Sequence, residues 1–145
     1  MSPRFHVVFG IAASVVVAVA IAWGFFLVGS PATRRLERFD ERRLQDLQTI
    51  VREIHLMVAD PYKQGTLKDA LPKTLEEAAQ RARNQRVNPR DPETDEPYTY
   101  TVKNDTTFEL CATFAQKRDD DSRVFWNHPA GKHCLTIDVL NPPPF

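Results

Sequence analysis

An uncharged apolar stretch near the start of the chain constrains its fold more than any other feature. It runs from Val7 to Val28, reads VVFGIAASVVVAVAIAWGFFLV, and carries no charged side chain. At 1.5 Å of rise per residue, about 22 residues make a helix of roughly 33 Å, enough to cross the hydrocarbon core of a bilayer. Trp23 and two phenylalanines lie near its end, where aromatic side chains often meet headgroups. We therefore predict a transmembrane helix over residues 7–28, preceded by a short segment, residues 1–6.

A cleaved signal peptide is the alternative interpretation of this stretch. Its apolar region would span about 7–15 residues, fewer than are found here. The small residues of Ser30-Pro31-Ala32 could serve as a cleavage site. We favour a retained anchor, because the apolar stretch is too long for the alternative.

Two kinds of evidence disagree about the orientation of this helix. Only Arg4, His6 and the amino terminus can carry positive charge before it, whereas five arginines follow it between residues 34 and 43. The positive-inside rule would therefore keep the larger domain in the cytoplasm. Two cysteines that could pair favour the opposite side, because disulfides persist in oxidising compartments. We expect a single-pass protein of the bacterial inner membrane whose soluble domain is extracytoplasmic.

A second helical pattern follows the anchor, and it is amphipathic. From Arg34 to about Asp60, apolar residues recur at about 100° per residue along one stripe, and polar residues lie opposite. We assign residues 29–60 to this juxtamembrane segment, in which Pro31 either kinks a continuous helix or begins a new one. Asp40 and Arg43 interrupt the stripe, so we expect the first turns to be less buried than the rest. The apolar stripe comprises Leu36, Phe39, Leu44, Leu47, Ile50, Val51, Ile54, Met57 and Val58.

Basic side chains at the start of this helix predict contacts with lipid headgroups. Each such contact is worth roughly 1 kcal/mol near an anionic membrane surface. The alternative is a helix face that is merely solvated. Leu56 is the exception on the polar face, and we take it as a candidate contact for a partner protein, although single exposed leucines are common. The predicted headgroup contacts are Arg34, Arg35, Arg38 and Arg42.

The remainder, residues 61–145, predicts a small α+β domain. Asp60-Pro61 ends the long helix, because the residue before a proline disfavours helical angles. Thr74, followed three residues later by Glu77, forms the capping box of a second, short helix.

Alternating patterns then predict an antiparallel sheet of about three strands with one face covered by the long helix. The expected strands are 98–102, 107–115 and 133–139, and Asn104-Asp105 is expected to form a two-residue hairpin turn between the first two. A long loop, residues 116–132, joins the second and third strands. Loops of this length are usually functional or mobile.

The acidic segment DPETDEPYTY, residues 91–100, allows two interpretations. Clustered carboxylates can bind metal or perform acid–base chemistry. However, Asp-Pro pairs begin turns, and Asp95 tolerates a left-handed backbone conformation. We therefore predict a turn.

The two cysteines predict a disulfide. In the expected register, Cys111 and Cys134 lie on the sheet face away from the helix and could meet if their strands are neighbours. A bridge closing a loop of about twenty residues would stabilise the fold by roughly 3 kcal/mol. Two free thiols in a cytosolic domain are the alternative. Zinc binding is not expected, because the cysteines lack CxxC spacing.

No motif in the chain predicts catalysis or a cofactor. No nucleophile stands beside an evident base, and five glycines form no phosphate-binding loop. The equal counts of 19 basic and 19 acidic residues argue against a nucleic-acid binder. A metal site drawn from His128, His133 and the aspartates 119–121 matches no known ligand spacing. Trp126, in the long loop, could contact a partner or, as we favour, pack on the core.

The order of these elements resembles the major pseudopilin of type II secretion. The likeness covers roughly residues 46–114 and implies a pilin-like fold outside the cytoplasm. The segment DPETDEPYTY followed by FELCATF also resembles uncharacterised bacterial single-pass membrane proteins with the same domain, in which glycine commonly replaces Asp95. The matching residues are Tyr62, Gly65, Leu71-Pro72, Leu75, Asp91-Pro92 and Tyr98-Thr99-Tyr100.

The amino terminus departs from the pseudopilin pattern. A prepilin leader has a glycine cleavage site and a glutamate five residues into the mature chain, whereas IAASV follows Gly10 here. We therefore expect an unprocessed anchor, and no calcium ligand of the family is transferred to this chain.

Three functions are consistent with these features. The first is a non-enzymatic, membrane-anchored accessory or structural subunit that docks on a larger membrane protein complex. The second is a pseudopilin-like filament or secretion component. The third is an extracytoplasmic ligand-binding or sensor domain that uses the loop 116–132. We favour the first, with the bilayer and membrane protein subunits as partners and no small-molecule substrate.

Overall fold

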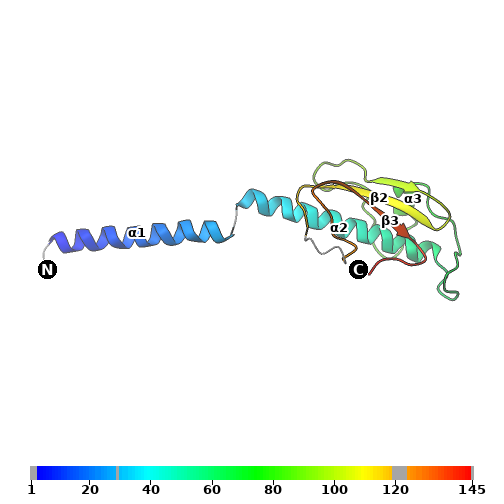
Figure 1. Ribbon diagram of the computed structural model, residues 1–145, viewed down its shortest axis with the longest axis horizontal. Helices are drawn as coiled ribbons and strands as arrows, with labels where there is room; N and C mark the ends of the chain where they lie inside the picture. Colours follow the sequence, from blue (N-terminus) through cyan, green and yellow to red (C-terminus); the bar gives the residue numbers. More distant parts are fainter. Residues whose placement is uncertain (1–2, 29, 119–123, 145) are drawn as a thin grey trace. The chain divides into compact units, whose positions relative to one another are not determined.

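A computed structural model describes residues 3–28, 30–118 and 124–144 of the chain (Figure 1). The chain divides into two units, Met1–Arg35 and Leu36–Phe145. The described residues form an α+β fold with an apolar helix, an amphipathic helix, a short helix and a three-stranded antiparallel sheet, which confirms the predicted fold class.

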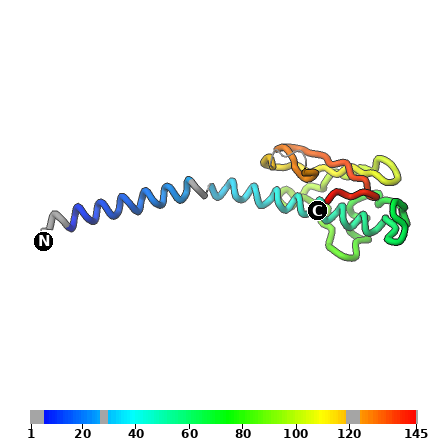
Figure 2. Tube along the Cα trace, turned by 60° about the horizontal axis from the view of Figure 1, so that its bottom comes forward, coloured from blue at the N-terminus to red at the C-terminus, as the bar shows by residue number. Residues whose placement is uncertain are grey.

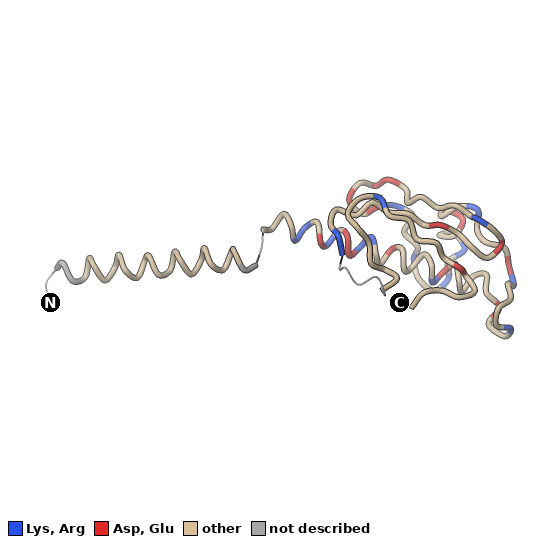
Figure 3. The backbone as a smooth tube through the Cα atoms, in the orientation of Figure 1, with Lys and Arg blue, Asp and Glu red and all other residues tan. Residues whose placement is uncertain are grey.

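Helix α1, Pro3–Val28, contains the predicted transmembrane stretch. Its residues from His6 to Phe26 include no lysine, arginine, aspartate or glutamate, as Figure 3 shows. By length and composition, one apolar helical stretch in the described part of the chain can cross a membrane, and it lies near the N-terminus.

Helix α2, Pro31–Val58, begins at the proline rather than running through it. The Oγ atom of Ser30 accepts a hydrogen bond of 3.2 Å from the backbone N–H of Thr33, which satisfies one of the unpaired donors of the first turn. Proline is well suited to a first helical position, because its missing N–H would have had no partner there. The predicted stripe is buried from Leu44 onward except at the half-buried Met57, and residues 31–35 are exposed.

The short helix α3, Leu75–Arg81, begins at the predicted cap. The backbone N–H of Glu77 donates to the Thr74 hydroxyl at 3.2 Å, and the Glu77 carboxylate accepts from the backbone N–H of Lys73 at 2.8 Å. Leu75 and Ala78 are the residues of this helix that enter the core.

The sheet has the strand order β1-β2-β3, with β1 at Thr99–Val102, β2 at Thr107–Phe114 and β3 at Gly131–Asp138. Both pairs are antiparallel. The predicted two-residue hairpin turn is wrong, because the connection spans residues 103–106. The Asn104 side chain shapes this longer loop by accepting hydrogen bonds from the backbone N–H groups of Thr106 and Thr107 at 2.9 and 2.8 Å.

The core lies between α2 and one face of the sheet (Figures 1 and 2). Helix α2 contributes Leu47, Ile50 and Ile54, each with no exposed surface. Phe108 and Leu110 of β2 are equally buried and belong to the same cluster. One face of the sheet thus meets the apolar side of the long helix, as the alternating pattern predicted.

Candidate functional site

A cluster of buried charges joins α2 to the acidic turn. Arg43 of α2 donates from Nε to Asp91 Oδ2 at 2.5 Å and from Nη2 to Asp91 Oδ1 at 3.0 Å. The same guanidinium donates to Glu93 at 2.7 Å and to Asp40 at 2.8 Å. Arg43 and Asp40 are 3% and 7% exposed. Asp40 is thus an exception in the first turns of this helix, which are otherwise exposed or half-buried over residues 31–39, as expected. Arg43 and Asp40 are buried because each has charged partners.

Asp40 also fastens the end of β2 to the helix. Its two carboxylate oxygens accept hydrogen bonds from the backbone N–H groups of Ala115 and Gln116, at 2.9 and 2.8 Å. The charge cluster therefore ties together three segments that are distant in sequence: the helix, the acidic turn and the end of the central strand.

The acidic segment is a turn, as predicted. The Asp91 carboxylate accepts from the backbone N–H groups of Glu93 and Thr94, at 2.8 and 3.0 Å, and the backbone N–H of Asp95 donates to the Asp91 carbonyl. Asp95 has a φ of 58°, the left-handed conformation expected for it. Asp91 thus serves both as the turn's internal cap and as the partner of Arg43.

The environment fixes the charges in this cluster. Burial opposes ionisation of Asp91, but the hydrogen bonds from Arg43 and from the turn outweigh it and hold the pKa of Asp91 below its usual value. Burial likewise disfavours the Arg43 cation, and its three carboxylate partners more than compensate, which raises the pKa of Arg43. Both groups are therefore held in their charged forms, which suits a permanent structural link.

The two alternate tyrosines after the turn anchor β1 and the residue before it. The Tyr98 hydroxyl donates to Asp46 of α2 at 3.1 Å, and the Tyr100 hydroxyl donates to the carbonyl of Pro72 at 2.9 Å. Burial raises the pKa of Asp46, although its hydrogen bonds from Tyr98 and Asn88 oppose this shift. These contacts explain structurally why tyrosines occupy both positions.

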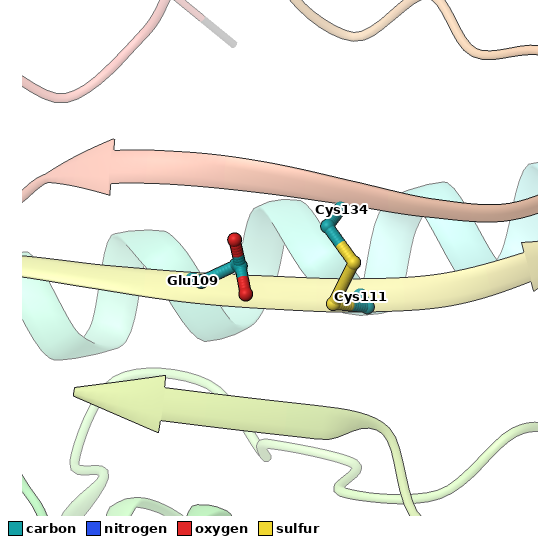
Figure 4. Close-up of side chains that lie close together, drawn as sticks. All are labelled: Glu109, Cys111 and Cys134. Atoms are coloured by element: carbon teal, nitrogen blue, oxygen red, sulfur yellow. A yellow bond between two sulfur atoms is a disulfide. The ribbon is translucent and has the colours of Figure 1, made fainter. Parts of the chain in front are cut away.

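A disulfide links β2 and β3, as the cysteines predicted. Cys111 pairs with Cys134 in the register of the two strands. Figure 4 shows the bridge with Glu109 beside it on the same side of the sheet and α2 behind the strands. The Glu109 carboxylate and the two sulfurs lie within 4.8 Å of one another, but sulfurs bonded to each other are not thiolate ligands for a metal. Glu109 instead pairs with Lys103 at 3.1 Å.

The described part of the loop before β3 packs against the core. Trp126 is 5% exposed and its indole N–H donates to the Pro144 carbonyl at 2.6 Å, which agrees with the favoured core packing. A partner contact through Trp126 stays a prediction. His128 is 6% exposed and stacks on Phe114 with 3.5 Å between ring centroids. Burial lowers the pKa of His128 and favours its neutral ring. The aspartates 119–121 lie outside the described residues, and His133 is on β3.

The remaining predicted contact residues are on α2. Arg34, Arg35, Arg38 and Arg42 are exposed, as headgroup contacts would require, and Arg42 also lies over the Phe39 ring. Leu56 is 46% exposed and lines a cavity that also reaches Glu53.

Reasoning from the sequence missed the buried charges of α2, above all Arg43 and Glu53. The signal available was the position of charged residues within an apolar stripe. Such residues are usually paired when buried, but the sequence does not indicate which distant carboxylate supplies the partner.

Comparison of the chain with protein-family models, with curated proteins and with solved structures gives no match.

Proposed function

We propose that this protein is a non-enzymatic accessory subunit, anchored in the bacterial inner membrane by α1, whose folded domain docks on and stabilises a larger membrane protein complex. One observation carries the proposal: a single chain contains an apolar helix of 26 residues and a folded domain with an internal disulfide.

The use of the charged residues supports a structural role. The acidic turn was the candidate for metal or acid–base chemistry. Its Asp91 carboxylate instead accepts hydrogen bonds from Arg43 and from the backbone of the turn. His128 is buried in a stack with Phe114. Groups held in this way stabilise the fold of the domain.

The bilayer is a second partner in this proposal, because its headgroups contact the exposed arginines at the start of α2. These arginines follow Val28, the last residue of α1, by 6 to 14 positions in sequence, and in this proposal they bind anionic headgroups. The domain is extracytoplasmic in this proposal, and the disulfide supports that side, because reducing conditions in the cytoplasm disfavour such bonds.

The direct test is purification of the intact protein from its native membranes in mild detergents. We expect one protein to copurify in a fixed stoichiometry, and to be lost when α1 alone is purified as the control. Absence of a stoichiometric partner in several detergents would contradict the proposal.

A pseudopilin-like filament subunit is the second candidate, and the resemblance of residues 46–114 to the major pseudopilin supports it. A filament subunit would have a processed amino terminus and would assemble with copies of itself, so mass spectrometry of the purified chain separates the two candidates. The sensor alternative predicts a thermal shift with a ligand or divalent ion.

A further inference from the structure

A cavity of about 630 Å³ lies between the second half of α2 and the segment that ends α3. Glu53, Leu56 and Met57 line it from α2. Lys68, Arg81 and Arg83 are among the residues that line it from the other side.

Glu53 is the unusual residue of this cavity. Its side chain is 2% exposed, and its Oε2 atom accepts from the backbone N–H groups of Arg83 and Asn84 at 3.3 and 3.2 Å. Its Oε1 atom is buried without a hydrogen-bond partner, the one such side-chain atom among the described residues. By contrast, the buried carboxylates of Asp40 and Asp91 have partners on both oxygens. No described group of the protein therefore donates a hydrogen bond to Oε1.

The cationic side chains in the cavity wall do not fill this gap. The Lys68 ammonium donates to the carbonyl of Leu56 at 3.0 Å. The Arg81 guanidinium donates to Asp69 and to Glu77, the latter at 3.1 Å. Lys68 and Arg81 face other acceptors, and no described donor, the Arg83 guanidinium included, reaches Oε1. A ligand that completes the cavity therefore has to bring its own N–H donor to Glu53.

The burial of Glu53 restricts what can carry that donor. Because Oε1 is buried, the donor must sit at the end of a slender chain. Leu56, 46% exposed, and the half-buried Met57 provide apolar surface beside it. A lysine side chain combines an alkyl stem with a compact ammonium head, whereas the arginine head is a broader plane.

We propose that this cavity binds a primary alkylammonium group, and that in the membrane the group is a lysine side chain of the protein on which the domain docks. This inference rests on the proposed docking function. The ammonium donates to Glu53 Oε1 in a charge-assisted hydrogen bond, and the alkyl stem packs on Leu56 and Met57.

The chemistry can be tested without the partner, by nuclear magnetic resonance of the intact chain in detergent micelles. The backbone N–H signals of Arg83 and Asn84 report on Glu53, because both donate to it. Three probes are titrated: n-butylammonium, n-butyltrimethylammonium, which is charged but has no N–H, and n-butanol, which is a donor without charge.

We expect n-butylammonium alone to shift these signals in a saturable way, with an affinity at least about tenfold above that of the other two probes. Glu53→Gln should reduce the affinity about tenfold, and Glu76→Gln, on an exposed residue outside the cavity, should not change it. If Glu53→Gln does not fold, the comparison of the three probes on the unaltered chain decides alone. Equal binding of all three probes, or no saturable shift, would overturn the inference and leave a buried water as the partner of Oε1.

The source of the group is tested in native membranes by a photocrosslinker placed at residue 56. A crosslink to a lysine-containing peptide of the copurifying protein, weakened about tenfold by Glu53→Gln, supports the docking role. A copurifying partner without ammonium binding would refute this site and leave the proposed function standing. Ammonium binding without a partner would refute the proposed function and leave the site, and no crosslink from residue 56 would refute the lysine source.

Discussion

Replacing Arg43 by methionine should destabilise the domain more than any other substitution of a charged residue on α2. Methionine has a similar length and fits a buried position, so the change removes the guanidinium with little loss of volume. Asp40 and Asp91 would then remain buried and negative without a counter-charge.

The expected loss of unfolding free energy depends on which hydrogen bonds each carboxylate retains. Removing one partner of a buried ion pair costs roughly 3–5 kcal/mol. Asp91 retains hydrogen bonds from two backbone N–H groups of its turn, and Asp40 retains those of Ala115 and Gln116. We therefore expect the lower end of that range, about 3 kcal/mol for Arg43→Met.

The assay is urea unfolding of the intact chain in a nonionic detergent, followed by tryptophan fluorescence in a Trp23→Phe background, so that the buried Trp126 alone reports. With a slope of about 1.5 kcal/mol per molar urea, the midpoint should fall by about 2 M. Arg38→Met is the matched control, because Arg38 is an exposed arginine of the same helix, and its effect should stay within about 0.5 kcal/mol.

A double-mutant cycle isolates the pair itself. Asp91→Asn keeps an oxygen to cap the turn but removes the charge, so Arg43→Met combined with Asp91→Asn should be less destabilising than the sum of the two single changes by about 1–3 kcal/mol. Additive effects, or a midpoint for Arg43→Met equal to that of Arg38→Met, would refute the reasoning that this cluster holds the turn on the helix.

Three further predictions concern the sheet, the loop and the turn. Reduction of the Cys111–Cys134 bridge, which spans 23 residues, should lower the free energy of unfolding by about 3 kcal/mol, and a variant with alanine at both positions should show no response to reductant. Because burial lowers the pKa of His128, the folded domain favours the neutral ring; its contribution is complete above about pH 6.5 and is lost as the pH falls through the lowered pKa. His128→Phe, which can keep the stack, should flatten the dependence of the unfolding midpoint on pH in that window, and an unchanged slope would contradict this. Asp95→Gly should unfold at the same or higher urea concentration, whereas Asp95→Val should lose about 1–2 kcal/mol, because the backbone there is left-handed; equal stability of these two variants would show that the conformation carries no cost.

Periodicity in the sequence predicted the elements whose environment is set by local pattern. The apolar run gave α1, the stripe gave the buried side of α2, and the alternation in β2 and β3 placed Cys111 and Cys134 on the same face. These features depend on which face of an element is apolar, and that is visible residue by residue.

The buried charges were not predictable in this way, because they depend on contacts between distant residues. Arg43 and Asp91 are separated by 48 positions, and Glu53 meets the backbone of Arg83 across 30. The hairpin was mispredicted for a local reason: Asn104 bonds to the backbone beyond it and favours a longer loop.

The intact mass of the protein purified from bacterial membranes tests the central claim most directly, since a docking subunit needs α1 as its anchor. We predict that the mature chain contains the whole of α1 and stays in the membrane fraction after alkaline extraction. A mature chain that begins beyond Ala32 and is recovered in the soluble fraction would contradict the account.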